Sequence, residues 1–130
     1  MKKIMLNLVL VSVLMFSVNL FGQQREIKPV EFRKISDRLF EIIGGSGAQG
    51  GMYVGDNGVL VIDAKMDKTS VEQVIKRIEK ITDKPIKYLV NTHSDGDHVS
   101  GNQYFPKGII IISHENCRKE FFHTKRDGSE

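Results

Sequence analysis

The sequence predicts an α/β fold, and two features of its pattern indicate this class. Residues 69–81 repeat apolar side chains at the spacing of an amphipathic helix. This stretch lies between two runs of branched apolar residues, 59–62 and 86–90, which are typical of strands. Strand, helix and strand in this order predict a βαβ unit, whose two strands are parallel and joined by a right-handed crossover in nearly all cases.

The N-terminal segment predicts export. Lys2 and Lys3 precede an apolar stretch, residues 4–21, that ends at a polar break. This is the layout of a secretory signal peptide, so we assign residues 1–22 to a signal peptide and residues 23–130 to one domain. A membrane anchor is the alternative, because the stretch just reaches the length that spans a bilayer. We expect a periplasmic or secreted protein that contacts a membrane only if this segment stays uncleaved.

Composition excludes some functional classes. The chain has 19 Lys and Arg against 16 Asp and Glu, and Lys2 and Lys3 belong to the signal segment, so the domain itself is nearly neutral. It has no patch of basic residues interleaved with aromatic ones, which argues against binding to nucleic acid. The single Cys117 excludes an internal disulfide and a multi-cysteine zinc site, and we expect it to be a small buried side chain.

A strand, a glycine-rich tract and a hairpin precede the predicted helix. Residues 39–43 predict a short strand, which the first glycine of the tract GGSGAQGG, residues 44–51, brings to an end. The tract leads into another strand and not into a helix, which favours a mobile loop between strands over a phosphate-binding loop. Turn residues at 56–58, flanked by apolar residues 52–54 and 59–62, indicate a β-hairpin.

Local signals bound the predicted helix and the elements after it. Thr69 and Glu72 fit a capping box at the helix start, and Pro85 stops the helix before the strand 86–90. Further along the chain we expect three elements: a short helical turn at 99–105, an apolar strand at 108–112 and an amphipathic helix at 115–122.

The segment NTHSDGDHVSGN, residues 91–102, carries side chains that bind metals. It directly follows the strand 86–90, and ligands of open α/β sheets bind at the carboxyl edge of the strands. Two imidazoles and two carboxylates lie within six residues: His93, Asp95, Asp97 and His98. This set suits zinc, manganese or iron rather than the all-oxygen cage of calcium. Gly96 would permit the sharp turn that lets these side chains converge.

Two other interpretations explain these residues less well. An EF-hand counted from Asp95 fails, because its fifth, sixth and twelfth positions would be Val99, Ser100 and Pro106. In the second interpretation, the aspartates only cap a turn and the short helix after it, while the histidines stay partly exposed. We favour a metal site, because clustered ionisable groups of this kind need a role that offsets their mutual repulsion.

The motif resembles the signature of the metallo-β-lactamase superfamily, which is His-x-His-x-Asp-His after a strand that ends in Thr. The hairpin GMYVGDNGVLVIDA, the helix and the strand IKYLV also stand in the family's order at suitable spacing, so the resemblance covers residues 30–122. It implies a four-layer αββα sandwich with its active site at one edge between the two sheets. Only the first half of this sandwich is present in the sequence.

The resemblance also implies roles for individual residues. His93 resembles the first ligand of metal site one, and Asp97 and His98 resemble the two site-two ligands that this motif supplies. Asp95 stands where the family has its second histidine. Asp63, at the end of its strand, matches a family aspartate that is usually structural, so we expect it to support the ligands without binding a metal.

The activity implied is that of an exported metal-dependent hydrolase, acting through a metal-bound hydroxide on an ester, amide, thioester or lactam bond of a small molecule. One or two zinc ions would lower the pKa of a bound water to about 7, and Asp97 would be the catalytic residue that orients this water. Asp95 makes site one harder and more anionic, which favours iron or manganese and lowers hydrolytic power. The alternatives are a non-catalytic or truncated ligand-binding protein of the same fold, and an iron-dependent redox member.

The family takes its remaining ligands from a second half that this sequence lacks. We therefore interpret the chain as a fragment or a truncated gene product, and expect it to be inactive alone. His114 follows the predicted strand 108–112, but a surface or structural role is favoured for a lone histidine, and His123 is expected to be inert. Half a sandwich also predicts an exposed sheet edge and an uncovered apolar face.

Overall fold

The structure is a computed structural model that describes residues 27–123 of the chain, with side chains described as far as Phe121. The predicted signal peptide, residues 1–22, lies outside the described residues. Within the described part of the chain, no helix has the length and apolar character needed to cross a membrane.

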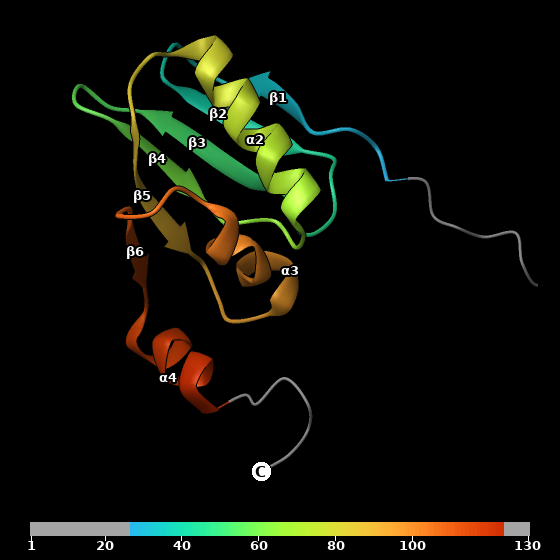
Figure 1. Cartoon of the computed structure of the whole chain (residues 1–130). Helices are drawn as coiled ribbons and strands as arrows, with labels where there is room; N and C mark the ends of the chain where they lie inside the picture. Colours follow the sequence, from blue (N-terminus) through green and yellow to red (C-terminus); the bar gives the residue numbers. More distant parts are fainter. Residues whose placement is uncertain (1–26, 124–130) are drawn as a thin grey trace, which may run out of the picture.

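The strands of residues 27–123 form one six-stranded sheet in the order β1-β2-β3-β4-β5-β6 (Figure 1). These strands are β1 (Glu31–Lys34), β2 (Leu39–Ile43), β3 (Gly50–Val54), β4 (Val59–Ile62), β5 (Ile86–Asn91) and β6 (Ile110–Ser113). Strands β1 to β4 pair antiparallel, whereas β5 runs parallel to both β4 and β6. The helices are α2 (Lys68–Ile81), α3 (Gly96–Val99), the 3₁₀ helix η1 (Ser100–Tyr104) and α4 (Glu115–His123).

This order confirms the βαβ unit and the hairpin predicted from the sequence. Strands β4 and β5 are parallel with α2 between them along the chain, and β3 pairs with β4 across the predicted turn. The helical turn predicted at 99–105 is present as η1, whereas α3 before it was not predicted, and β6 begins at Ile110 and not at residue 108. Strand β1 was not predicted, because its burial does not alternate and every residue in it except Phe32 is exposed.

Helix α2 lies against one face of the sheet, where the main core forms (Figure 1). Its buried apolar residues are Val71, Val74 and Ile78, at the spacing that the sequence predicted. They join buried sheet residues in one cluster, which includes Phe40, Met52, Val59, Val61 and Leu89. Fully burying an aliphatic side chain of this size stabilises the fold by about 1.5–3 kcal/mol, so this cluster holds α2 on the sheet.

The start of α2 corrects the predicted capping box. The helix begins at Lys68, and its N-cap is Asp67, whose side chain accepts a hydrogen bond from the Ser70 amide at 2.8 Å. Thr69 is therefore a helical residue and not the cap. Aspartate caps helices at least as well as threonine, and it precedes Thr69 in the chain, so the helix starts at the earlier cap.

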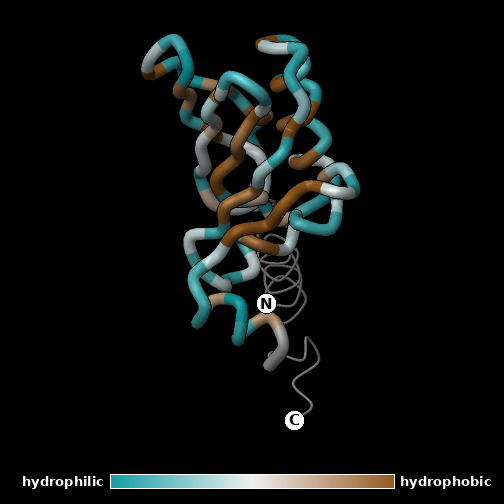
Figure 2. Tube along the Cα trace, turned by 90° about the vertical axis from the view of Figure 1, so that its left-hand side faces the viewer, coloured by the Kyte–Doolittle hydropathy of each residue, from teal (hydrophilic) through white to brown (hydrophobic). Residues whose placement is uncertain are grey.

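Among residues 27–123, the opposite face of the sheet is apolar and uncovered, as half a sandwich predicted. Tyr53, Leu60, Tyr88 and Ile110 form one row across β3, β4, β5 and β6. Three of them are well exposed, with 42% of Tyr53, 38% of Tyr88 and 56% of Ile110 accessible. Figure 2 shows the hydrophobic strands of the sheet beside hydrophilic turns. Edge strand β6 exposes its isoleucines on both faces.

Candidate metal centre

The parallel pair of β4 and β5 places the segments that follow these strands side by side. The Asp63 amide donates to the Val90 carbonyl at 2.8 Å, which extends the pairing one residue beyond β4. Asp63 then leaves the strand with a left-handed backbone, φ 61°, that few non-glycine residues adopt. This turn brings its buried carboxylate to the start of the motif, directly beside Thr92.

Asp63 accepts hydrogen bonds from two motif residues. The Thr92 amide donates to Oδ1 at 2.9 Å, the Thr92 hydroxyl to Oδ2 at 2.8 Å, and His98 Nδ1 lies 2.9 Å from Oδ2. A carboxylate oxygen is an acceptor, so a neutral His98 ring that donates in this contact carries its proton on Nδ1. This leaves His98 Nε2 unprotonated and able to bind a metal, which is how a carboxylate commonly orients a ligating histidine.

Thr92 connects Asp63 to His93 through hydrogen bonds. Its hydroxyl has one proton, which it donates to Asp63, so its oxygen is an acceptor toward His93 Nδ1 at 3.2 Å. If the His93 ring is neutral and donates from Nδ1 in this contact, its Nε2 is the nitrogen that can bind a metal. The two imidazole rings lie close together, with centroids 3.8 Å apart. One buried carboxylate therefore contacts His98 directly and His93 through Thr92.

Each free Nε2 atom lies beside one of the predicted carboxylate ligands. His93 Nε2 is 3.3 Å from Asp95 Oδ2, and His98 Nε2 is 3.5 Å from Asp97 Oδ2. Two ligands about 2.0–2.1 Å from a tetrahedral zinc ion are about 3.3 Å apart. Both pairs thus have the spacing of two neighbouring ligands on one ion, and their nitrogen and oxygen donors suit zinc or a harder divalent metal.

The four predicted ligands form two pairs and not one enclosed site. Among residues 27–123, no group of three or more His, Cys, Asp or Glu side chains is arranged to hold a metal ion. A stable metal site needs more than two protein ligands, so each pair would need further ligands.

The other residues singled out from the sequence lie as follows. His114 is exposed, and its Nδ1 accepts from the Asn116 amide at 3.2 Å in the first turn of α4. Cys117 is buried, whereas the His123 side chain lies outside the described part. The expectation for Gly96 was wrong: its φ is not positive, and an added Cβ would come near only one side-chain atom, 3.2 Å away.

The glycine that the motif does require is Gly101. A Cβ there would lie 2.0 Å from the Ala64 carbonyl oxygen, so η1 can pack on the loop after β4 only with glycine at this position. The next residue, Asn102, exchanges side-chain amide hydrogen bonds with buried Asn91, at 2.8 and 3.1 Å. Sequence reasoning missed Asn91, Thr92 and Asn102 as supports of the site. Their position inside the motif was the available signal.

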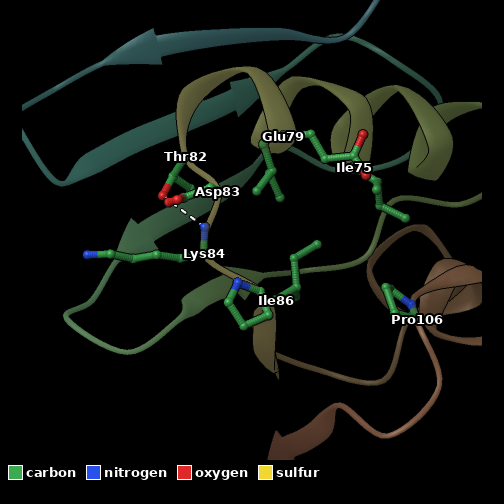
Figure 3. A pocket seen from close by; sticks show the side chains of 9 residues that line it. Ile75, Glu79, Thr82, Asp83, Lys84, Ile86 and Pro106 are labelled. Carbon is green, nitrogen blue, oxygen red and sulfur yellow. Dashed lines mark hydrogen bonds between the residues drawn. The ribbon is translucent and has the colours of Figure 1, made fainter.

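Two of the hollows in the described part of the chain differ in their relation to the motif. One, of about 400 Å³, adjoins the motif and is lined mainly by residues of α3, η1 and α4, among them Ser94, Gly96, Asn102 and Phe121. The other, of about 320 Å³, lies between the end of α2 and Pro106, and its lining contains no histidine (Figure 3). The first hollow adjoins the metal motif through Ser94 and Gly96, whereas the lining of the second contains no motif residue but includes Glu79 and Asp83.

Comparison with known proteins identifies the family. The family described as the metallo-β-lactamase superfamily matches residues 44–129. Solved structures of similar fold include the metallo-β-lactamase FIM-1 from Pseudomonas aeruginosa in its mono-zinc form. Its TM-score is 0.67, and the sequence identity is 18% over 78% of this chain and 49% of that one. Metallo-β-lactamases from Hirschia baltica and Pontibacter korlensis have TM-scores of 0.66 and 0.65, with 16% and 19% identity over 74% and 73% of this chain and 48% of each of theirs.

The likeness covers only part of the solved structures. The chain spans about half the length of these solved structures, and identities below one fifth show a shared fold. A search of the curated proteins found no match. The six-stranded mixed sheet with its helices is therefore half of the metallo-β-lactamase fold, and this chain belongs to the metallo-β-lactamase superfamily.

Proposed function

We propose that this chain supplies the first half of the metal site of an exported hydrolase, which acts on an ester, amide, thioester or lactam bond of a small molecule. The observation that carries the proposal is the pairing of two free imidazole nitrogens with two carboxylates at the carboxyl edge of the sheet. Asp63 contacts the His98 ring directly and the His93 ring through Thr92. The apolar segment of residues 1–22 supports export.

In this proposal the motif residues have different roles. His93 and Asp95 hold one ion, and His98 and Asp97 hold a second. A bound metal would supply Lewis acidity toward the substrate and lower the pKa of a water molecule. Asp97, whose side chain is about half exposed at 48%, has an oxygen available to accept a proton from the attacking water and to orient it. Asp63 remains a positioning residue, since its carboxylate is buried beneath the rings.

Asp95 favours a second candidate for the metal itself. It places an anionic oxygen beside His93 where the family has an imidazole, and its side chain is 72% exposed. Oxygen ligands favour iron or manganese more than a second imidazole does. An iron-dependent redox protein is therefore the second candidate function, and it predicts a coloured protein where the zinc hydrolase predicts a colourless one.

Metal uptake tests the proposal directly. We expect the purified 130-residue chain to bind zinc or iron weakly, because each pair supplies only two ligands, and elemental analysis and competition with a chromophoric chelator measure this binding. His98→Ala and His93→Ala should each weaken that binding at least tenfold, because each removes a ligand. His114→Ala is the matched control, since this histidine is exposed and contacts only the start of α4. Absence of metal from the wild type, or equal effects in all three variants, would contradict the proposal.

Activity tests the role of Asp95. Supplied with zinc, the longest available form of the protein should hydrolyse a chromogenic ester or cephalosporin slowly, and Asp95→His should hydrolyse the same substrate faster at neutral pH. The reason is that an extra anionic ligand weakens the acidity of a bound water. A wild type as active as Asp95→His would show that Asp95 does not lower hydrolytic activity, and would contradict the preference for a harder metal at this position.

A further inference from the structure

Lys65 is the largest fully buried side chain of the described residues, although lysine is seldom buried. It follows β4, is 2% exposed and has a left-handed backbone with φ 63°. Its ammonium donates to the carbonyl oxygens of Gly44 and Ala48, each at 2.7 Å. Burial lowers the pKa of Lys65 from its ordinary value. A charge is tolerated there only because these carbonyls take the place of water.

The two carbonyls belong to the two ends of one glycine-rich loop, residues 44–48. Gly44, Gly45 and Gly47 have positive φ angles of 68°, 68° and 102°. Only glycine adopts a run of such angles without strain, so the tract has the composition required to fold around a cation. The sequence favoured a mobile loop between strands. The structure confirms that the tract connects β2 and β3, and shows that Lys65 bridges its two ends.

The same loop contacts the metal motif. The Ala48 amide donates to the Asp97 carbonyl at 3.0 Å, and a Cβ at Gly47 would lie 2.6 Å from that oxygen. On the other side, the Ala64 amide donates to the His98 carbonyl at 2.7 Å. The backbone of Asp97 and His98 is therefore held between the glycine loop and the segment that carries Lys65.

We propose that Lys65 is a positioning residue for the metal centre: its buried ammonium closes the loop of residues 44–48 so that Ala48 holds the Asp97 peptide, which sets the direction of the Asp97 and His98 side chains. This inference rests on the proposed metal-binding function. It assigns the glycine tract to the support of the motif and not to contact with substrate. The connection from Lys65 to Asp97 runs through one loop and two sets of hydrogen bonds.

Lys65→Met tests the inference, because it keeps most of the side-chain stem and removes the ammonium. Lys84→Met is the matched control. The Lys84 ammonium also donates to a loop carbonyl, that of Gly55 at 2.8 Å, but this lysine lies beside the hollow at the far end of α2 (Figure 3). Amide hydrogen exchange of the metal-free chain and affinity for Zn²⁺ and Co²⁺ are the two measurements. The visible spectrum of the Co²⁺ form reports ligand geometry.

In Lys65→Met we expect the Ala48 amide to exchange at least tenfold faster while amides of β4 and β5 stay protected. Loss of a group that orients metal ligands typically weakens metal binding by about 10–100-fold, and we expect that loss here together with an altered Co²⁺ spectrum. Lys84→Met should leave all three unchanged. Lys65→Gln, which keeps a neutral donor, should fall between the wild type and Lys65→Met.

Unchanged Ala48 exchange, or unchanged metal affinity and spectrum in Lys65→Met, would overturn the inference. If Lys65→Met does not fold, Lys65→Gln decides by the same measurements. Loss of fold in both, with Lys84→Met folded, would assign Lys65 to global stability and also overturn it. A wild type that binds no metal contradicts the proposed function instead, and Ala48 exchange in the metal-free chain then decides whether Lys65 positions the loop.

Discussion

The two ends of the parallel pair β4–β5 differ sharply in what they bury. At the carboxyl ends, three polar residues are almost fully buried: Asp63, Lys65 and Asn91. At the amino ends, β4 and β5 meet through a backbone hydrogen bond from Val59 to Pro85 of 2.9 Å, and the neighbouring turn exposes its polar side chains to solvent. The chain thus accepts the cost of burying polar groups at one end only.

The difference in buried polar groups indicates the role of each end of the β4–β5 pair. Buried polar groups remain stable only when each has a hydrogen-bond partner in a defined place, so such a network fixes side-chain directions more tightly than apolar packing does. The carboxyl end uses it to hold the rings of the two motif histidines and the path of the motif backbone. The amino end needs only to close a turn. Substitutions of the same residue type at the two ends should therefore have unequal effects.

The largest inequality is expected between two aspartates. Asp63→Ala removes a buried acceptor from Thr92 and His98, and leaving such donors unpaired should lower the free energy of unfolding by about 3–5 kcal/mol and abolish metal binding. Asp56→Ala removes only an exposed ion pair with Arg38, at 2.8 Å, and should cost less than about 1 kcal/mol. Urea unfolding and metal titration measure both effects. Similar losses at the two positions would show that the ends do not differ.

The next largest difference in stability is expected between substitutions of two asparagines. Asn91→Ala breaks the reciprocal amide pair with Asn102 inside the motif and should cost about 1–3 kcal/mol, because the Asn102 amide loses both of its bonds. Asn57→Ala, in the exposed turn between β3 and β4, should change the free energy of unfolding by less than about 0.5 kcal/mol. The double variant with Asn102→Ala should cost less than the sum of the single variants, as a double-mutant cycle in urea would measure. Additive losses would contradict the pairing.

Most of the fold was predictable because its signals are local or periodic. The spacing of Val71, Val74 and Ile78 and the turn of the β3–β4 hairpin specify elements without reference to distant residues. Errors arose where local signals compete or are weak. Asp67 and Thr69 both suit a cap, and only the observed start of the helix distinguishes them. Strand β1 has no alternating burial to reveal it.

The candidate site was predictable at the level of its ligands and not of its supports. The motif residues stand together in the sequence, so their chemistry could be inferred before any folding. Lys65 acts on a loop 17 to 21 residues away, and its burial contradicts the usual exposure of lysine, so no sequence pattern predicts its position. Its left-handed backbone is likewise a product of tertiary contacts.

The smallest expected effect is also a pH effect, at the N-cap of α2 on the carboxyl side of β4. Burial tends to raise the pKa of Asp67, but hydrogen bonds led by that from the Ser70 amide lower it more, so the net pKa lies below its ordinary value of 3.8. A depressed pKa means that the cap stabilises the fold fully above that ordinary value and loses its contribution as the pH falls through the folded-state pKa. Asp67→Ala should therefore cost about 0.5–2 kcal/mol at neutral pH and less once the pH falls below the folded-state pKa, where the charge-dependent part of the cap is lost.

Two control variants separate charge from capping at this position. Asp67→Asn keeps a capping side chain without a titrating group, so its free energy of unfolding should stay near that of the wild type at neutral pH and should vary less as the pH falls. Asp83→Ala, exposed just beyond the other end of α2, should change the free energy of unfolding by less than about 0.5 kcal/mol at neutral pH. Urea unfolding of all four proteins, followed from pH about 7 to about 2, measures these differences. The cost of Asp67→Ala could instead stay constant over this pH range. That result would mean that the hydrogen-bonding geometry of the Asp67 side chain, and not the charge of its carboxylate, stabilises the start of α2.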